Sequence, residues 1–203
     1  MQNLSGIELP EPQLDSPTSI ESALRRRRSV REFLSRPVTL AQVSQLLWAA
    51  QGLTGNEGRR TAPSAGALYP LELLVVAGNP GELPAGIYRY RPGSHDLVLV
   101  HEGDRRRPLA SAALGQEWVA QAPLTLAITA VFDRTARKYG QRARRYVDME
   151  AGHAAQNIHL QAVALDLGTV VVGAFDDAEV SKVLGLAGNE QPLCLMPIGT
   201  PRP

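Results

Sequence analysis

Residues 146–167 constrain the fold most strongly, because they read as one long helix with apolar side chains on two sides. One stripe at helical spacing holds Val147, Ala151, Ala154, Ile158, Ala162 and Leu165, and the other holds Ala155, Leu160, Val163, Ala164 and Leu167. A helix of this length spans roughly 33 Å, the width of a small domain. Apolar residues on two sides predict burial on both, with one side against a sheet. The second side faces either another subunit or the rest of a monomer.

The composition fits a globular protein without a broad basic surface. Of the 203 residues, 44% are hydrophobic and 20% are charged, which is enough apolar material for a sizeable core. The net charge of only +1 argues against a nucleic-acid partner. The single cysteine, Cys194, excludes an internal disulfide and fits a reducing compartment. No signal peptide is evident, and the apolar run 122–132 is too short to span a bilayer, so we expect a cytoplasmic protein without a membrane partner.

The order of expected elements indicates an α+β fold, with one domain over residues 19–203 after an extended arm over residues 1–18. The arm is polar and contains three prolines. Helices are expected near 16–24, 39–53, 146–167 and 177–186, with residues 133–145 as a basic loop. Strands are expected near 71–78, 86–92, 95–103, 124–132, 168–175 and 192–199.

Several common enzyme signatures are missing from the sequence. There is no Gly-x-Gly-x-x-Gly, Walker loop, Gly-x-Ser-x-Gly elbow or Cys-x-x-Cys, which argues against a dinucleotide-binding domain, a P-loop enzyme and a serine hydrolase. His153 and His159 are six residues apart, whereas paired metal ligands on a helix are usually four apart. We therefore expect no metal site and assign these histidines to hydrogen bonds in the core or an interface.

The stretch "RRRRSVREF", residues 25–33, concentrates positive charge. An arginine guanidinium offers paired donors that match a phosphate, and Ser29 adds a hydroxyl donor. Taken alone, the stretch fits a solvated helix end at least as well, because cations are favoured at a helix C-terminus. A nucleic-acid-binding stripe is a third interpretation, without interleaved aromatic residues to support it.

Two further stretches are rich in small residues. In "APSAGALYP", residues 62–70, two prolines fix the backbone around Ser64, Ala65 and Gly66, which leave room for a flat group. The stretch "VVVGAFDD", residues 170–177, ends a buried strand at Gly173, where a backbone N–H is free to meet a ligand. Each pattern is common in loops on its own.

Together and in this order, "RRRRSVREF", "APSAGALYP", "EAGHAAQN" and "VVVGAFDD" resemble the flavin-dependent nitroreductase superfamily. Within it the chain is similar to the SagB-type dehydrogenase branch, which is related to thiazoline and oxazoline oxidases. The resemblance extends from about Ile7 to Pro201. It implies an α+β sandwich with a mainly antiparallel central sheet, flanking helices and the long helix at the interface of a homodimer. It also implies one FMN in each of two interface sites.

The resemblance further implies a role for each matching residue. Arg27, Arg28 and Ser29 would hold the FMN phosphate and ribityl chain, Arg31 would lie near the N1/C2 edge of the ring, and Gly199 and Arg202 would close the phosphate site. Pro63, Ser64, Ala65 and Gly66 would line the ring from the other subunit, and Val172, Gly173 and Ala174 would face its N5 edge.

Lys138 and Tyr139 resemble the Lys-Tyr pair with which azoline-oxidising relatives assist proton removal, although exposed loop residues are an equal alternative. The resemblance therefore implies an FMN-dependent oxidoreductase. Its substrate is a small molecule or a modified peptide, either dehydrogenated at an azoline or reduced with NAD(P)H. Two alternatives stay open, a flavin-binding sensor or carrier with little turnover and an arginine-rich nucleic-acid-binding domain.

Overall fold

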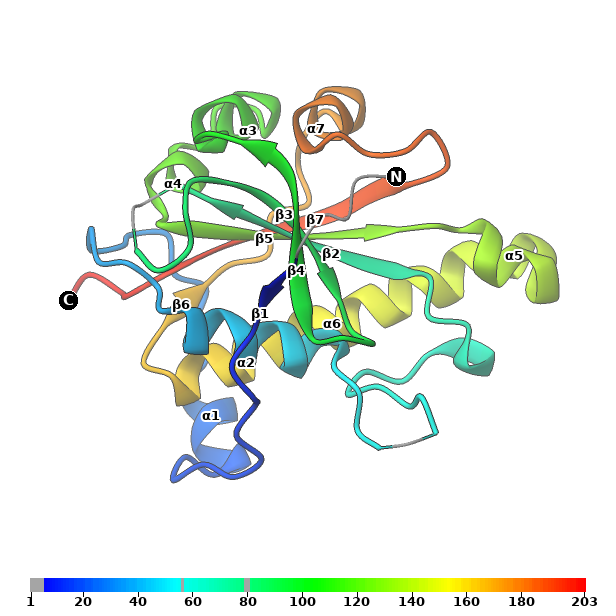
Figure 1. Ribbon diagram of the computed structural model, residues 1–203, viewed down its shortest axis with the longest axis horizontal. Helices are drawn as coiled ribbons and strands as arrows, with labels where there is room; N and C mark the ends of the chain where they lie inside the picture. Colours follow the sequence, from blue (N-terminus) through cyan, green and yellow to red (C-terminus); the bar gives the residue numbers. More distant parts are fainter. Residues whose placement is uncertain (1–5, 56, 79–80) are drawn as a thin grey trace.

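In the computed structural model, which describes residues 6–55, 57–78 and 81–203, one antiparallel sheet runs through the molecule (Figure 1). Within these residues its strand order is β1-β4-β3-β2-β5-β7-β6. The strands are β1 (Ile7–Glu8), β2 (Leu71–Ala77), β3 (Gly86–Arg91), β4 (Asp96–Glu102), β5 (Leu124–Ala130), β6 (Gly168–Thr169) and β7 (Gln191–Gly199). The expected α+β fold with a mainly antiparallel central sheet is confirmed.

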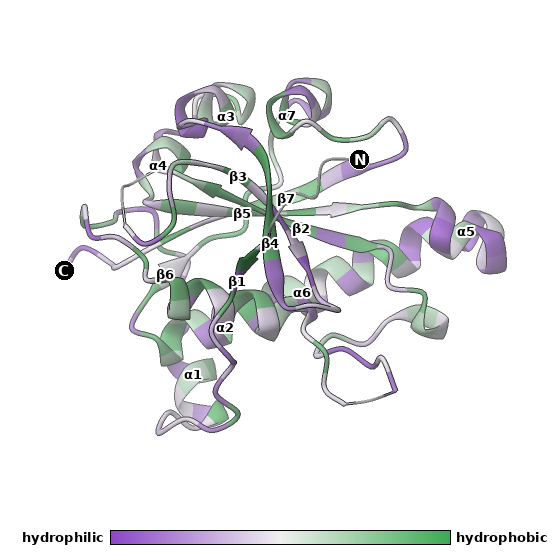
Figure 2. Cartoon of the chain, viewed as in Figure 1, coloured by the Kyte–Doolittle hydropathy of each residue, from purple (hydrophilic) through white to green (hydrophobic). Residues whose placement is uncertain are grey.

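Helices cover both faces of the sheet (Figure 1). On one face lie α1 (Ile20–Arg26), α2 (Leu40–Gln51) and α6 (Ala143–Ala164), and on the other lie α3 (Arg106–Ala112), α4 (Glu117–Gln121) and α7 (Asp177–Leu184). Alternate residues of β2 enter the two cores: Leu73 and Val75 face α2 and α6, whereas Leu74 and Val76 face α3 and α7. The central strands are therefore apolar on both faces. In Figure 2, which colours each residue by hydropathy, the strands carry green apolar stretches beside white and purple ones.

Local sequence signals explain where the first two helices begin. The Ser19 hydroxyl caps α1 by accepting from the backbone N–H of Ser22. At α2, Thr39 and Gln42 form a reciprocal capping box. Buried Leu46, Leu47 and other apolar residues then fix α2 against the sheet. Helix α2 lies within its expected range, whereas α1 begins four residues later than expected and ends two residues later.

The long helix α6 begins three residues earlier than expected and ends three residues earlier. Its first apolar stripe is buried, apart from Leu165, which is partly buried and follows the helix. In the second stripe Leu160, Val163 and Ala164 are only partly buried. One side of α6 thus packs under the sheet, and the other is incompletely covered in this single chain.

Two segments differ from their expected structure. Residues 133–145 are not a loop but contain α5 (Asp133–Tyr139), the 3-10 turn η2 (Gly140–Arg142) and the start of α6. Asp133 in the first turn and Lys138 in the last suit the dipole of α5. The expected strand 168–175 is reduced to β6, because only Val172 forms a further bridge, to Leu195.

The N-terminal segment lies partly outside the described residues, since residues 1–5 are not among them. Within the expected arm, β1 pairs with β4 at the edge of the sheet. After it, residues 9–18 pass along α2, where the backbone N–H of Gln13 donates to Gln45.

Candidate functional site

The arginine stretch meets two distant parts of the chain. The backbone N–H of Val30 donates to the carbonyl of Thr169 at 2.9 Å, and that of Arg202 donates to the carbonyl of Glu32 at 3.0 Å. Of the predicted phosphate-site residues, Ser29 and Arg202 are exposed, whereas Gly199 is buried in β7 between Phe33 and Pro123. The structure thus brings the predicted N-terminal and C-terminal phosphate residues into one neighbourhood.

A hollow of about 260 Å³ opens beside this junction. Arg26, Arg28, His159 and Thr169 are among the residues that line it. Arg28 is exposed, and its Nη1 donates to the carbonyls of Arg25 and Arg27 at 3.0 and 2.7 Å. Burial and the nearby half-buried Arg27 lower the pKa of His159, so the neutral imidazole is favoured there. Asp166 lines the same hollow and pairs with Arg26 at 3.2 Å, which leaves Arg28 as the cation of the lining best placed for an anion.

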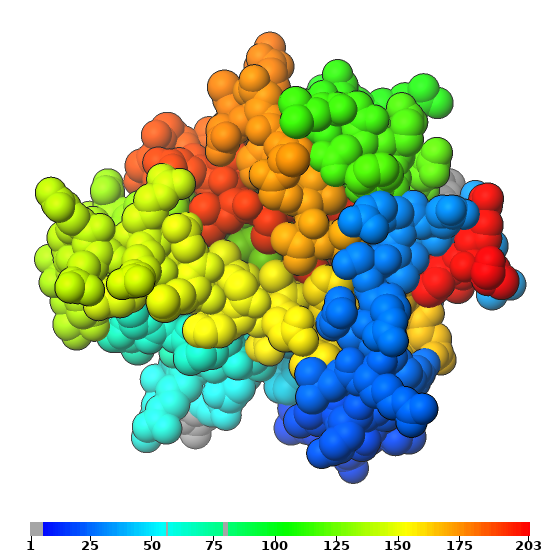
Figure 3. All heavy atoms as spheres, turned by 180° about the vertical axis from the view of Figure 1, so that it is seen from behind, coloured from blue at the N-terminus to red at the C-terminus, as the bar shows by residue number. Residues whose placement is uncertain are grey.

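A second hollow, of about 370 Å³, lies further along the same side of α6. Its lining includes Ala151, Gly152 and Ala155 of α6 together with Val171 and Gly173. A Cβ added at Gly152 or Gly173 would meet no atom within 4 Å, so both glycines face open space. Figure 3 shows this surface, with the segment after β6 crossing beside α6. The α6 side of the hollow is made of small residues, and its rim also includes the charged residues Arg144, Asp148 and Asp177.

The two hollows follow one helical face. Ala155 lines one and His159 the other, a single turn apart, so the hollows adjoin along α6. The segment 168–173 borders both, with Thr169 at the first and Gly173 at the second. The hydroxyl of Thr169 is buried without a hydrogen-bond partner among the described residues. We refer to these two neighbouring hollows together as the groove along α6: one has a cationic rim, and the other presents small residues of α6.

Helix α4 supplies two contacts that the sequence did not predict. The guanidinium of Arg31 lies over the ring of Trp118, 5.6 Å from its centroid. Just before α4, Gln116 Nε2 donates to the carbonyl of Ala174 at 2.7 Å. Val172 is buried, whereas Gly173 and Ala174 are exposed. Through α4, the predicted N1-edge and N5-edge residues are held near one another.

The loop 62–70 has an unusual backbone. Gly66, Ala67 and Tyr69 have φ angles of 65°, 53° and 45°, in a region that residues with a Cβ rarely adopt. The hydroxyl of Ser64 accepts from the backbone N–H of Tyr69 at 2.9 Å and helps to hold this shape. Pro63 and Gly66 are exposed.

The same loop lies against the predicted lysine and tyrosine. A Cβ placed on Gly66 would lie 2.9 Å from the Tyr139 hydroxyl and 3.0 Å from Lys138 Nζ. Lys138 is exposed, and its Nζ is 5.4 Å from the centroid of the Tyr139 ring. The fold therefore brings residues 63–66 together with Lys138 and Tyr139, which are more than seventy positions away in the sequence.

Arg134 connects these two segments. Its Nη1 donates to the carbonyl of Tyr69 at 3.1 Å, and its Nη2 pairs with Glu72 at 2.5 Å. The Arg134 side chain thus bonds both to the strained loop and to the start of β2, and we call these two contacts the clamp. No general sequence signal predicts the clamp, because a basic residue in a polar segment is ordinarily solvated.

Arg134→Ala should loosen α5 and the loop without unfolding the domain. The clamp is partly exposed, so we expect a loss of only about 0.5–1 kcal/mol of unfolding free energy. Hydrogen exchange of α5 and residues 62–70 should accelerate. Arg137→Ala is the matched control, on the same helix and without an ion pair among the described residues. Equal acceleration in both variants would contradict the clamp.

Glu150 is the buried titratable group of this region. It is only 2% exposed, and its Oε1 has no hydrogen-bond partner among the described residues. Burial raises its pKa to about 6, against the opposing influence of Ser64, Arg60 and Gln51. The sequence pattern gave no sign of this group, since position 150 reads as a polar interruption between apolar stripes.

Glu150→Gln should stabilise the protein at pH 8. A carboxyl whose pKa is raised by folding contributes its stability below the unfolded pKa of about 4.5 and loses it as the pH rises through about 6. The neutral amide avoids that loss, worth up to about 2 kcal/mol. Urea unfolding followed by circular dichroism should show the gain at pH 8 and almost none at pH 4. A variant that is less stable at pH 8 would contradict this assignment.

The model of the Nitroreductase family matches residues 24–200. The chain belongs to the nitroreductase family. A Methanocaldococcus jannaschii protein named as a nitroreductase is 45% identical over 193 residues, covering 95% of this chain and 96% of that protein. The predicted family is therefore confirmed.

Solved structures of two other proteins share the fold. A Ralstonia eutropha protein, also named as a nitroreductase, superposes with a TM-score of 0.87 at 32% identity, covering 100% of this chain and 93% of that one. A chain of the Escherichia coli microcin synthetase McbBCD, in complex with truncated pro-MccB17, gives a TM-score of 0.75 at 26% identity, covering 100% and 80%.

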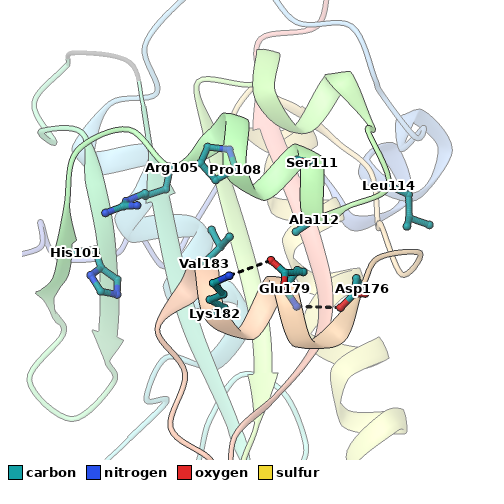
Figure 4. A pocket seen from close by; sticks show the side chains of 10 residues that line it. All are labelled: His101, Arg105, Pro108, Ser111, Ala112, Leu114, Asp176, Glu179, Lys182 and Val183. Carbon is teal, nitrogen blue, oxygen red and sulfur yellow. Dashed lines mark hydrogen bonds and ion pairs between the residues drawn. The ribbon is translucent and has the colours of Figure 1, made fainter.

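Another hollow of this nitroreductase-family chain, about 610 Å³ in volume, lies between the end of β4, α3 and α7 (Figure 4). His101, Arg105 and Lys182 contribute to its lining, whereas the predicted flavin residues do not. Its acidic groups are already engaged: Asp176 caps α7 and Glu179 pairs with Lys182. It is separate from the groove along α6.

The described residues contain no group of three or more His, Cys, Asp or Glu side chains placed to hold a metal ion. The helices that the structure describes include none that is both long and apolar enough to cross a membrane.

Proposed function

We propose that this nitroreductase-family protein is an FMN-dependent oxidoreductase that exchanges hydride between bound flavin and a small-molecule or peptide substrate. The observation that carries the proposal is the groove along α6, with arginines at one end and the small residues Ala151, Gly152 and Ala155 of α6 at the other. FMN has the matching shape, an anionic phosphate joined to a flat ring. When bound, FMN supplies the hydride chemistry, while the protein binds, orients and tunes it.

At the phosphate end, Arg27, Arg28 and Ser29 would hold the anion, with Arg202 reaching it from the C-terminal segment. The support is their convergence beside the hollow that Arg28 and Thr169 line. The unpartnered Thr169 hydroxyl is a buried donor without a protein acceptor, which fits a ligand oxygen there. Gly199 would not contact the phosphate itself. Its close packing against Phe33 and Pro123 would position the C-terminal segment that carries Arg202.

At the ring end, Val172, Gly173 and Ala174 would face the flavin, and Arg31 would supply positive charge near its N1 edge. Gly173 fits this role because nothing lies within 4 Å of a Cβ placed there, so a flat group can approach the backbone. The hydrogen bond from Gln116 fixes the neighbouring Ala174 carbonyl. Arg31 is supported by Trp118.

We further propose that the active form is a homodimer. Glu150 lies beside Ser64, whereas Gly152, about 200° further around α6, lines the hollow at Gly173. Residues 63–66 and that hollow thus lie on roughly opposite sides of one helix, so both can line one ring only if they come from different chains. Exposed Met149 on α6 and exposed Val171 in the segment after β6 supply apolar surface for such an interface.

Lys138 and Tyr139 would be the acid–base pair on the substrate side. They lie against Gly66, the residue of the loop that would line the ring. A base at this position would accept the proton when hydride leaves a saturated C–N bond, as in azoline oxidation. The similarity to a microcin synthetase chain crystallised with a peptide makes a modified peptide one substrate class to test, alongside NAD(P)H-dependent reduction. The buried free thiol of Cys194 fits a reducing cytoplasmic location.

The first test is the colour of the purified protein. We expect flavin absorption near 450 nm, about one FMN per chain after reconstitution, and a dimer in light scattering. Anaerobic mixing with NADH or NADPH then separates the substrate classes, since bleaching indicates a reductase and stable colour directs attention to azoline peptides. A colourless protein that ignores added FMN would exclude the proposed function. Bound flavin that no donor or substrate reduces would instead indicate a carrier.

A further inference from the structure

The acidic side chain of Glu150 is buried where too few hydrogen-bond donors are available to stabilise a negative charge. It lies between α6, the end of α2 and the loop 57–69, and is 2% exposed. Its Oε1 and the nearby Gln51 Nε2 are both buried without hydrogen-bond partners among the described residues. Gln51 Oε1 is already occupied by the guanidinium of Arg60, at 2.9 Å. The carboxyl is therefore enclosed by polar groups that do not saturate it.

What encloses this carboxyl is the strained loop itself. Ser64 stands beside Glu150 and also accepts the backbone N–H of Tyr69. Arg60 stacks on the Tyr69 ring at 4.6 Å, and its backbone N–H donates to the Tyr69 hydroxyl at 3.2 Å. Tyr69 and Ala67 both have positive φ. The loop shape that presents Gly66 to Lys138 and Tyr139 is thus the one that keeps water from Glu150.

We propose that Glu150 is a positioning residue for the candidate flavin site: its neutral form keeps the loop 62–70 closed on α6, and its ionised form favours an opened loop that hydrates the carboxylate. The inference rests on the proposed function only in that this loop would line the flavin ring. Its action is exerted through Ser64 and the loop backbone, without contact to the reacting atoms.

The groups that face Glu150 determine whether a rise in pH opens or closes the loop. Three groups face the Glu150 carboxyl: the Arg60 guanidinium from the loop, Gln51 from α2 and Ser64 from the segment 63–66. The charge of Arg60 is influenced in turn by Tyr69, Glu72 and Arg134. Arg60 favours the ionised carboxyl, but burial outweighs this and raises the pKa from 4.5 to about 6. A state with a hydrated carboxylate is therefore favoured above pH 6, by up to about 30-fold if the ordinary pKa returns on opening.

The test measures amide exchange of the ligand-free protein, because this readout needs no flavin. The amides of Ala67 and Tyr69 donate to Ser64 and report on loop closure. After correction for the intrinsic exchange rate, their protection should fall by up to about 8-fold between pH 5 and pH 8, because part of the full effect is already present at pH 5. Glu150→Gln should abolish this fall, while the amide of Val172, bonded to Leu195, should respond to neither change.

A second measurement follows FMN affinity by fluorescence. Glu150→Gln should bind FMN more tightly than the wild type at pH 8, by up to about 30-fold, and the difference should shrink to at most about 4-fold at pH 5. Glu179→Gln, an exposed acid on α7, should match the wild type. Loop protection that is unchanged with pH in the wild type, or that keeps its pH dependence in Glu150→Gln, would overturn the inference. Failure of the wild type to bind FMN would reject the proposed function and leave the exchange result to decide this one.

Discussion

Lys138→Ala should lower the rate of substrate oxidation by about 100-fold to 10,000-fold, the contribution of a well-placed general base. The expectation rests on position: Lys138 Nζ lies 3.0 Å from where a Cβ on Gly66 would be, at the loop proposed to line the flavin ring. Alanine removes the proton acceptor and leaves the backbone of α5 intact. The measurement is anaerobic stopped-flow bleaching of the flavin by a thiazoline-containing peptide.

The chain provides its own control for this experiment. Lys182 is the other lysine, exposed on α7 and remote from the groove along α6. Lys182→Ala should leave the bleaching rate unchanged, and both variants should retain flavin. Tyr139→Phe should give an intermediate loss if its hydroxyl assists Lys138. A Lys138→Ala variant that is bleached at the wild-type rate would remove Lys138 from the mechanism and leave it as a surface residue.

Arg28→Ala should weaken FMN binding by about 10-fold to 150-fold, equivalent to 1.5–3 kcal/mol for charge-assisted hydrogen bonds. Arg28 lines the cationic hollow, and its Nη1 also donates to the carbonyls of Arg25 and Arg27. The variant therefore loses both a phosphate donor and a cap on the end of α1. Fluorescence titration should reveal the loss, and it should shrink at high salt because screening weakens the wild type more.

Arg25→Ala separates these two contributions. Arg25 is the exposed neighbour whose carbonyl, rather than its guanidinium, bonds to Arg28. Its removal deletes a positive charge from the same stretch but keeps the contact to Arg28. We expect at most a 2-fold effect on FMN affinity. If Arg25→Ala and Arg28→Ala weakened binding equally, general charge rather than a defined phosphate contact would be responsible.

The fold was predictable wherever one segment carries its own pattern. The capping signal at Thr39 and the apolar spacing from Leu46 onward define α2, and the alternation in β2 reflects burial on both faces. Residues 133–139 were misread as a loop, because charged residues without an apolar stripe gave no helical periodicity. The strand expected over residues 168–175 is longer than the observed β6, because local propensity does not reveal whether a partner strand is available.

The candidate site was predictable only in part. The motifs identified the family and nominated the segments, and the structure brings Gly66 to Lys138 and the arginine stretch to residue 202. The individual FMN, lysine and tyrosine roles stay predictions. The sequence did not predict roles for three residues, Trp118, Glu150 and Arg134. Each role depends on a contact between segments more than sixty positions apart.

The place of β7 within the sheet also governs when the molecule can fold. This strand is synthesised after the other six strands of the sheet, yet it pairs along nearly its whole length with β5, about seventy residues earlier. Until it emerges from the ribosome, the apolar edge of β5 has no partner and β6 has no strand to join. Folding must therefore close a long-range antiparallel pair late, which makes it slower than helix formation and exposes nascent chains to aggregation. Truncation before residue 191 should consequently remove an interior strand of the sheet rather than trim its border.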